Sequence, residues 1–296
     1  MSITAQDVKN LREKTGAGMM DCKKALMETN GSFDAAVDFL KKEGLAKAVK
    51  KGDRIAAEGL VFSKVTGDSA LLLEVNCETD FVAKNEDFIR LGNKLVDFIL
   101  TNKPKDCEAL LKMQLDGVTV QDVINSNISV IGEKISLRRF YFFKAKEGGK
   151  IALYSHSGGK IAVLIEITGE AVTEEAGINI AMQIAAMSPE YIDKSQVARD
   201  VLDKEKEIQM EQLKKSGKPP EMLEKIIIGK LNKFAGEISL MQQIYVKDMG
   251  GKQSVGDYLK QVDKTAKVIQ FVRYAVGEGL EKKKDDFAAE VSRMTQ

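Results

Sequence analysis

One apolar pattern that occurs twice constrains the fold of this 296-residue chain more than any other feature. Residues 70–75 read Ala-Leu-Leu-Leu-Glu-Val, and residues 162–167 read Ala-Val-Leu-Ile-Glu-Ile. Gly67, shortly before the first run, aligns with Gly159 before the second. Because short apolar runs after a turn glycine are typical of buried strands, the chain is expected to use one strand unit twice.

The residues on either side of these runs extend the unit. An apolar run at 60–62 and the turn sequence Thr-Gly-Asp-Ser at 66–69 predict a strand and a turn before the first copy. Helical runs of apolar residues follow the two copies, at 87–100 and at 174–187. A hairpin followed by a helix predicts an antiparallel sheet with a covering helix. We therefore expect a multi-domain α+β protein with two related core subdomains.

The N-terminal residues predict three short helices with a thin shared core. Thr4 and Asp7 have the spacing of a capping box at the start of the first helix. Residues 16–18, Gly-Ala-Gly, separate this helix from the second, and an Asn-Gly pair separates the second from the third. Gly44 is expected to end the third helix. The lysine-rich residues 47–54 then form a linker with a solvated face.

Residues 197–238 predict an antiparallel helical hairpin. Apolar residues spaced as in a coiled-coil seam lie in its second arm: Leu223, Ile227, Leu231, Phe234 and Ile238. The sequence Ser-Gly-Lys-Pro-Pro at 216–220 separates the two arms. Such a sparse seam buries little surface, so the hairpin is expected to project from the core. A homodimer formed through it, packing on its own core and a free arm are the open alternatives.

The C-terminal part of the chain predicts three more elements. Ser254 and Asp257 have the spacing of a helix cap, and residues 268–274 return to the pattern of a strand. In the tail, Phe287 and Val291 lie on one face of an amphipathic helix expected at 285–294.

Composition narrows the class of function. Lys and Arg number 45 against 44 Asp and Glu, and a general nucleic-acid binder would carry a strong basic excess. The three cysteines are widely spaced, as expected for free thiols in a reducing compartment. The first residues lack the apolar stretch of a secretory signal, and no run reaches membrane-spanning length. We expect a cytoplasmic protein that binds other proteins, with no direct nucleic-acid or membrane contact.

Little in the sequence indicates an enzyme. His156 is the only histidine and has no Cys/His cluster near it, and no phosphate-binding glycine loop of the P-loop type occurs. Cys22 or Cys77 as a catalytic nucleophile is one alternative, but a buried free thiol is the commoner role. We expect neither covalent chemistry nor a cofactor.

Residues 76–85, Asn-Cys-Glu-Thr-Asp-Phe-Val-Ala-Lys-Asn, connect a predicted strand to a predicted helix. Most aromatic residues between such elements are buried, which favours Phe81 folding onto its own core and Asp80 capping the next segment. The alternative is an exposed aromatic anchor, the residue type that dominates interface energetics. The residues alone favour the buried alternative.

Several motifs resemble those of bacterial elongation factor Ts, in the family's order along the chain. Residues 79–85 match one signature, and residues 12–26, Arg-Glu-Lys-Thr-Gly-Ala-Gly-Met-Met-Asp-Cys-Lys-Lys-Ala-Leu, match an N-terminal one. Further matches lie at 216–220, 233–240, 276–279 and 286–291.

This resemblance implies a domain plan. A ubiquitin-associated-like three-helix domain would occupy residues 1–53. A first core subdomain would occupy 54–147, and a second would combine 148–195 with 239–278. The helical hairpin would be 196–238, and a C-terminal helical module would be 279–296.

The resemblance also implies a partner and a site. The partner would be elongation factor Tu, bound as its GDP complex and in its nucleotide-free form. Four residues would displace the magnesium ion beside its nucleotide: Thr79, Asp80, Phe81 and Val82. Further partner contacts would come from Arg12, Met19, Met20, His156, Phe287 and Val291. A protein-interaction scaffold without exchange activity is the alternative function.

Overall fold

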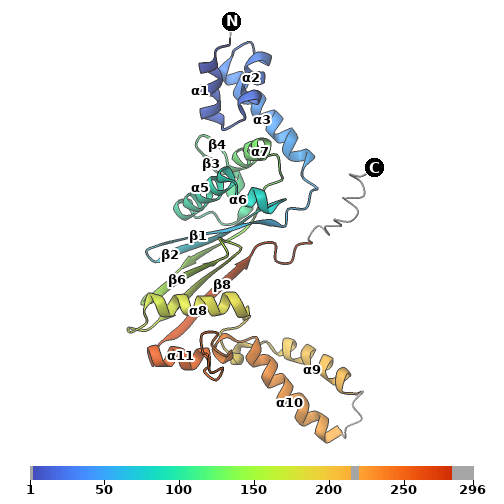
Figure 1. Cartoon of the computed structure of the whole chain (residues 1–296), viewed down its shortest axis with the longest axis vertical. Helices are drawn as coiled ribbons and strands as arrows, with labels where there is room; N and C mark the ends of the chain where they lie inside the picture. The colour runs from blue at the N-terminus through green and yellow to red at the C-terminus, as the bar shows by residue number, and fades with distance from the viewer. Residues whose placement is uncertain (1–2, 215–219, 282–296) are drawn as a thin grey trace.

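The computed structural model describes residues 3–214 and 220–281, and the three-helix start expected from the sequence is present (Figure 1). The helices are α1 Ala5–Thr15, α2 Met19–Glu28 and α3 Phe33–Lys50. Thr4 and Asp7 form the expected capping box. The small core between the helices contains Val8, Leu11, Ala17, Cys22, Ala25, Leu26 and Ala36.

The third helix is longer than expected. Gly44 does not end it, and α3 continues to Lys50 through part of the segment expected to be a linker. Gly44 is buried, and the backbone of Asn125 in α7 (Val120–Ile131) lies beside it. Since contact with a distant helix stabilises this turn, a glycine that local sequence rules treat as a stop remains helical.

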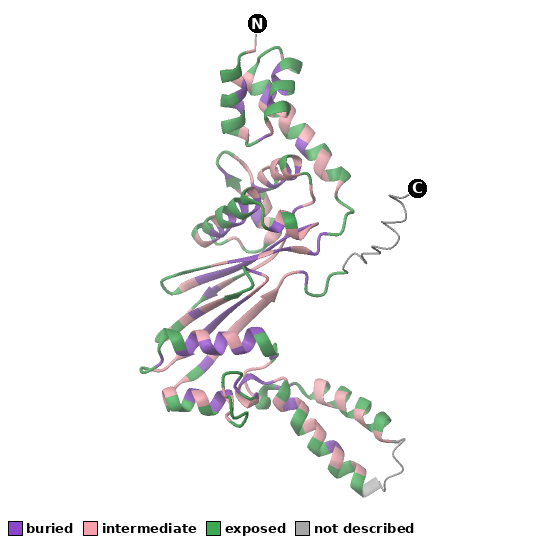
Figure 2. Cartoon of the chain, viewed as in Figure 1, coloured by how far each residue is buried: buried purple, intermediate pink, exposed green. Residues whose placement is uncertain are grey.

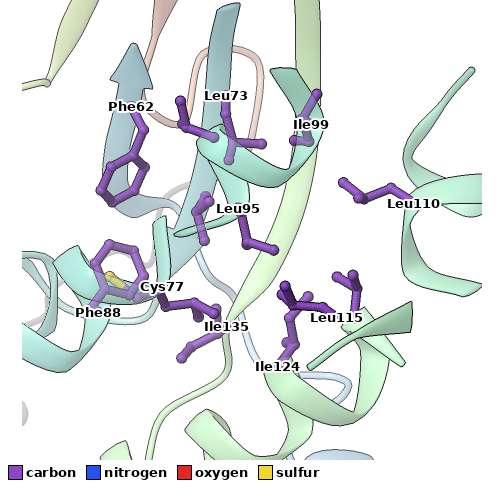
Figure 3. Close-up of a cluster of buried hydrophobic side chains, with 14 of the residues drawn as sticks. Phe62, Leu73, Cys77, Phe88, Leu95, Ile99, Leu110, Leu115, Ile124 and Ile135 are labelled. Carbon is purple, nitrogen blue, oxygen red and sulfur yellow. The ribbon is translucent and has the colours of Figure 1, made fainter. Parts of the chain in front are cut away.

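The first core subdomain contains a three-stranded antiparallel sheet in the order β1-β2-β5. Its strands are β1 Glu58–Thr66, β2 Ser69–Cys77 and β5 Ser136–Lys144. Between β2 and β5 lie α4 Asp80–Ala83, α5 Glu86–Asn102, α6 Cys107–Lys112, β3 Gln114–Leu115, β4 Val118–Thr119 and α7. The helices cover one face of the sheet, and Figure 3 shows Phe62, Leu73 and Leu95 packed in the core between them.

The second core subdomain repeats this plan. Its sheet has the order β6-β7-β8 and consists of β6 Gly149–His156, β7 Ile161–Thr168 and β8 Lys267–Ala275. Helix α8, Glu174–Met187, covers it, and α11, Val255–Val262, begins at the expected cap Ser254. Short turns of 3₁₀ helix lie at Lys194–Gln196 and Leu240–Gln242.

The two sheets pack face to face, which explains why their central strands carry apolar residues on both faces and are buried almost throughout. In β2, Leu71 and Leu73 face the helices, whereas Ala70 and Leu72 face the second sheet. Figure 2 shows both central strands almost continuously buried. A backbone hydrogen bond also joins the two subdomains, since the carbonyl of Gly159 accepts from Val61 N of β1 at 2.8 Å.

Helices α9 (Arg199–Lys214) and α10 (Pro220–Glu237) form the expected hairpin and project away from the second sheet (Figure 1). Most of their described residues are exposed or partly exposed (Figure 2). The two ends of the hairpin meet where Ile238 O accepts hydrogen bonds from the backbone N–H groups of Glu190 and Tyr191.

The structure does not describe residues 282–296, so Phe287, Val291 and the expected C-terminal helix lie outside it. Among the described residues, no helix combines the length and apolarity needed to cross a membrane.

Candidate functional site

Residues 78–85 fold into a short capped helix between β2 and α5. Thr79 is the N-cap of α4, and its side-chain oxygen accepts a hydrogen bond from Val82 N at 3.3 Å. Asn85 ends this turn and caps α5 in the same way, accepting from Asp87 N at 2.8 Å. Ala83 is buried in the main core, so α4 has one face fixed to the subdomain.

Phe81 lies on the opposite face of α4, with 79% of its surface exposed. The prediction that Phe81 folds onto its own core is therefore wrong. Asp80 does not cap a helix either, because Thr79 has that role and Asp80 is the first helical residue. Because Ala83 occupies the inner face of this four-residue helix, the ring of Phe81 on the other face points to solvent. Aromatic side chains are enriched among the residues that dominate binding energy at protein interfaces.

Asp80 forms an ion pair with Lys84 at 2.9 Å, and both side chains are open to solvent. The hydrogen bond from Lys84 lowers the pKa of the Asp80 carboxyl, and the charge of Lys160 acts in the same direction. Asp80 is thus an ionised acceptor beside the exposed ring at neutral pH.

Two glutamates fix the start of α4. Glu133 accepts hydrogen bonds from Glu78 N and Thr79 N, each at 3.0 Å, and from the Thr79 hydroxyl at 2.6 Å. In return, Glu78 accepts from Lys134 N at 2.6 Å. No motif or spacing in the sequence singles out Glu133. Its contacts span more than fifty residues, and no spacing rule connects segments so far apart.

Cys77, directly before this segment, is a core residue beside Phe88 (Figure 3). Burial raises the pKa of its thiol to about 12, and its S–H donates to Thr79 O at 3.1 Å. Cys22 is also buried, and burial raises the pKa of its thiol too. Neither thiol has the exposure and low pKa of a catalytic nucleophile.

His156 lies at the end of β6, in the turn of the second hairpin. It is exposed, and its Nδ1 is 2.9 Å from the hydroxyl of Tyr154. The same turn leads to Lys160, which forms an ion pair with Glu58 at 2.7 Å. Because Glu58 pairs with Cys77 across the sheet, the turn lies at the edge from which α4 begins.

The N-terminal candidates lie around a cleft between the first helices and the core. Arg12 and Met19 line one wall, and Asp87 and Arg90 of α5 line the other, enclosing about 1120 Å³. Met20 is 72% exposed and is not part of the lining. The wall formed by Asp87 and Arg90 belongs to α5, which directly follows α4 in the chain. Arg12 and Met19 therefore lie on a part of the surface that neighbours Phe81.

No group of three or more His, Cys, Asp or Glu side chains that could hold a metal ion occurs within residues 3–214 and 220–281.

The model of one protein family, described as elongation factor TS, matches residues 78–278. The matched region begins at Glu78, directly after β2, and ends after β8. It includes α4 to α7, strand β5 of the first sheet, the whole second sheet and the hairpin. Since it covers more than half of the sequence, the chain belongs to the elongation factor Ts family, whose members are nucleotide exchange factors for elongation factor Tu.

Proposed function

We propose that this chain releases GDP from elongation factor Tu by inserting Phe81 beside the partner's magnesium and phosphate site. The observation that carries the proposal is the 79% exposure of this ring on a helix whose other face is fixed to the core. An aromatic side chain buries a large area and loses few rotamers, so it suits a wedge in a preformed pocket.

The energetics of exchange are those of linkage. A factor that binds nucleotide-free elongation factor Tu more tightly than the GDP complex weakens GDP binding by the same ratio. Magnesium neutralises the phosphates, so displacing its ligands removes a large electrostatic contribution to GDP affinity. Binding energy alone drives this step, and the chain forms no covalent bond and needs no cofactor of its own.

Asp80 supports the wedge as a charged acceptor. Its partner in the free chain, Lys84, is the exposed C-cap residue of the same helix, so this ion pair is weak and easily exchanged. A donor on elongation factor Tu that replaces Lys84 would be drawn away from the magnesium site. Thr79 and Val82 contribute by holding the helix, since Thr79 caps it and Val82 donates to the cap.

The remaining contacts are assigned to three other parts of the chain. Arg12, Met19 and Met20 would bind the GTPase domain beside α4, and the two methionines are more than half exposed. His156 would meet another part of the partner from the edge where the second hairpin turns. Phe287 and Val291 would dock from the C-terminal helix expected at 285–294, which lies outside the described residues.

Partner choice and location follow from the same proposal. We place the chain in the cytoplasm with elongation factor Tu, without direct nucleic-acid or membrane contact, in keeping with its net charge of +1. A homodimer through the projecting hairpin is the self-association that we propose to test.

The test is release of labelled GDP from elongation factor Tu by Phe81→Ala. Truncating an interface anchor should lower the rate by about tenfold or more, whereas folding stability should change by less than about 0.5 kcal/mol at this exposed site. Met249→Ala, which truncates a fully exposed apolar side chain elsewhere on the surface, is the matched control and should exchange normally. Unchanged exchange by Phe81→Ala would refute the wedge. A parent chain that binds elongation factor Tu equally with and without nucleotide would indicate a scaffold.

A further inference from the structure

We propose that Glu133 is a positioning residue for nucleotide exchange, because it sets the orientation of α4 and therefore of Phe81. This inference rests on the proposed role of Phe81 and adds a residue from the end of a different helix. Glu133 touches neither nucleotide nor magnesium in this scheme, and it acts only through Thr79 and Glu78.

The contacts of Glu133 are concentrated on the first turn of α4. Oε2 accepts from the backbone N–H groups of Glu78 and Thr79, and Oε1 accepts from the Thr79 hydroxyl. The N–H groups that precede a helix have no partner within it, so one carboxylate satisfies donors that would otherwise face solvent. Hydrogen bonds to an ionised acceptor are stronger than those between neutral groups.

The connection is reciprocal. Glu78 accepts a hydrogen bond from Lys134 N at 2.6 Å, and Arg54 lies 3.3 Å from the same carboxylate. Two neighbouring backbone segments thus each offer a glutamate to the N–H groups of the other. Such an arrangement resists both translation and rotation of residues 78–79, which a single contact would not do.

The segment that carries Glu133 is itself fixed. Gly132 ends α7 in the left-handed conformation, with a φ of 87°, and Ile135 on the other side is buried in the main core. Lys134 Nζ donates to Gly52 O at 2.6 Å and to Arg54 O at 3.0 Å. Glu133 therefore holds α4 at a fixed position relative to α7 and β5, the packed helix and strand on either side of it in the chain.

Helix α4 depends on this support because it is too short to define its own direction. It has four residues, and isolated helices of this length do not form. Ala83 and Val82 hold its inner face in the core, but they lie at its C-terminal half. The N-terminal half, which aims the ring of Phe81, is held by Glu133 through Thr79.

The first test compares Glu133→Gln with the parent chain in GDP release. The neutral amide keeps one oxygen for Glu78 N and Thr79 N and can only donate to the Thr79 hydroxyl, so the charge-assisted hydrogen bonds that hold residues 78–79 are weakened. We expect the rate at saturating factor to fall about fivefold to tenfold, since small misplacements of a working group are costly. The factor concentration that gives half the maximal rate should change less than about twofold, because the other contact surfaces remain. Glu147→Gln, at an exposed site on the β5–β6 turn, is the matched control and should behave as the parent.

A second measurement reports on α4 directly. The chain contains no tryptophan, so Phe81→Trp introduces a single indole on this helix, which can be excited separately from the six tyrosines. Time-resolved anisotropy should show greater local motion of the introduced indole when Glu133→Gln is added, with the overall tumbling time unchanged. If Glu133→Gln does not fold, Glu133→Asp, which keeps the charge and shortens the reach, takes its place in both measurements.

The two proposals fail in different ways. If Phe81→Ala exchanges normally, the wedge is wrong whatever Glu133→Gln does. If Phe81→Ala is slow but Glu133→Gln exchanges at the parent rate, or the introduced indole is equally immobile with and without Glu133→Gln, the positioning role of Glu133 is overturned. A uniform loss of stability with no change in maximal rate would also overturn it.

Discussion

Glu74 and Glu166 are equivalent residues of the two central strands, each fully buried and each placed where the pairing with the third strand shifts register. Their partners differ. Arg138 and Arg139 pair with Glu74 at 2.8 and 2.7 Å. Glu166 accepts from the neutral donors Lys146 N and Gln270 Nε2, at 2.6 and 2.8 Å. Both copies of the repeat thus contain a buried carboxylate, but it is bound by arginines in the first copy and by neutral donors in the second.

Glu74→Gln should therefore cost more stability than Glu166→Gln. Removing the charge at Glu74 leaves partly buried Arg138 without its counterion and leaves Arg139 with only its longer ion pair to Glu278, at 3.4 Å. We expect a loss of about 3 kcal/mol in the free energy of unfolding. Glu166→Gln should cost about 1 kcal/mol, because its donors are neutral. Urea unfolding of both variants followed by circular dichroism measures the difference, and equal losses would contradict the assignment.

The contribution of Glu74 should also depend on pH. Burial by itself raises the pKa of Glu74, but hydrogen bonds from Gly277 N, Arg138 and Arg139 outweigh burial and leave the pKa below its usual value. A lowered pKa in the folded state stabilises the protein above the unfolded pKa and stops doing so as pH falls through the folded one. The gap in stability between the parent and Glu74→Gln should be constant near neutrality and shrink below about pH 4.3. A gap that widens in acid would show that the sign is wrong.

Cys77 should resist alkylation in the native state. Burial raises the pKa of its thiol to about 12, so almost no thiolate is present near neutral pH. Iodoacetamide labelling followed by mass spectrometry should modify Cys107, which is only partly buried, before Cys77. Rapid native labelling of Cys77, without unfolding, would reopen the thiol-enzyme hypothesis.

Gly159→Ala should loosen the contact between the two sheets. Gly159 has a φ of 98°, and an added Cβ would lie 3.3 Å from Val61 O. Backbone strain and the weakened Val61–Gly159 hydrogen bond should together cost about 1–3 kcal/mol. Gly67→Ala, also at positive φ but with open space around it, is the matched control for strain alone and should cost less in thermal unfolding.

Excising the hairpin should leave the core folded. Tyr191 and Ser239 form a parallel bridge at its base, so a short linker in place of residues 199–236 can join the chain there. The melting temperature of the remaining protein should stay within a few degrees of the parent, since the hairpin buries little against the core. Sedimentation of both proteins then tests the homodimer, and identical monomeric behaviour would exclude self-association through the hairpin.

Local patterns were sufficient to predict the elements whose residues contact sequence neighbours. The capping box at Thr4, the first hairpin, β7 and α8 all follow from turn residues and apolar spacing. Strand β5, Ser136–Lys144, was not predicted, because two arginines that pair with a distant glutamate interrupt its apolar pattern.

Long-range contacts account for the other errors. Helix α3 passes Gly44 because α7 packs against it, and the clamp by Glu133 crosses most of a subdomain. The exposure of Phe81 has a different origin. A lone chain gives no local reason to place an aromatic in solvent, so the resemblance, and not the residue pattern, pointed to this site.

The face-to-face packing of the two sheets has a consequence for synthesis on the ribosome. The first sheet is complete once Lys144 has emerged, but the second lacks β8 until Ala275, 131 residues later. At roughly 5–20 residues per second, the second sheet, which covers Ala70 and Leu72 of β2, stays incomplete for on the order of ten seconds. During that interval the nascent chain presents a half-built sandwich, which is the stage at which chaperone contact would matter most for this protein.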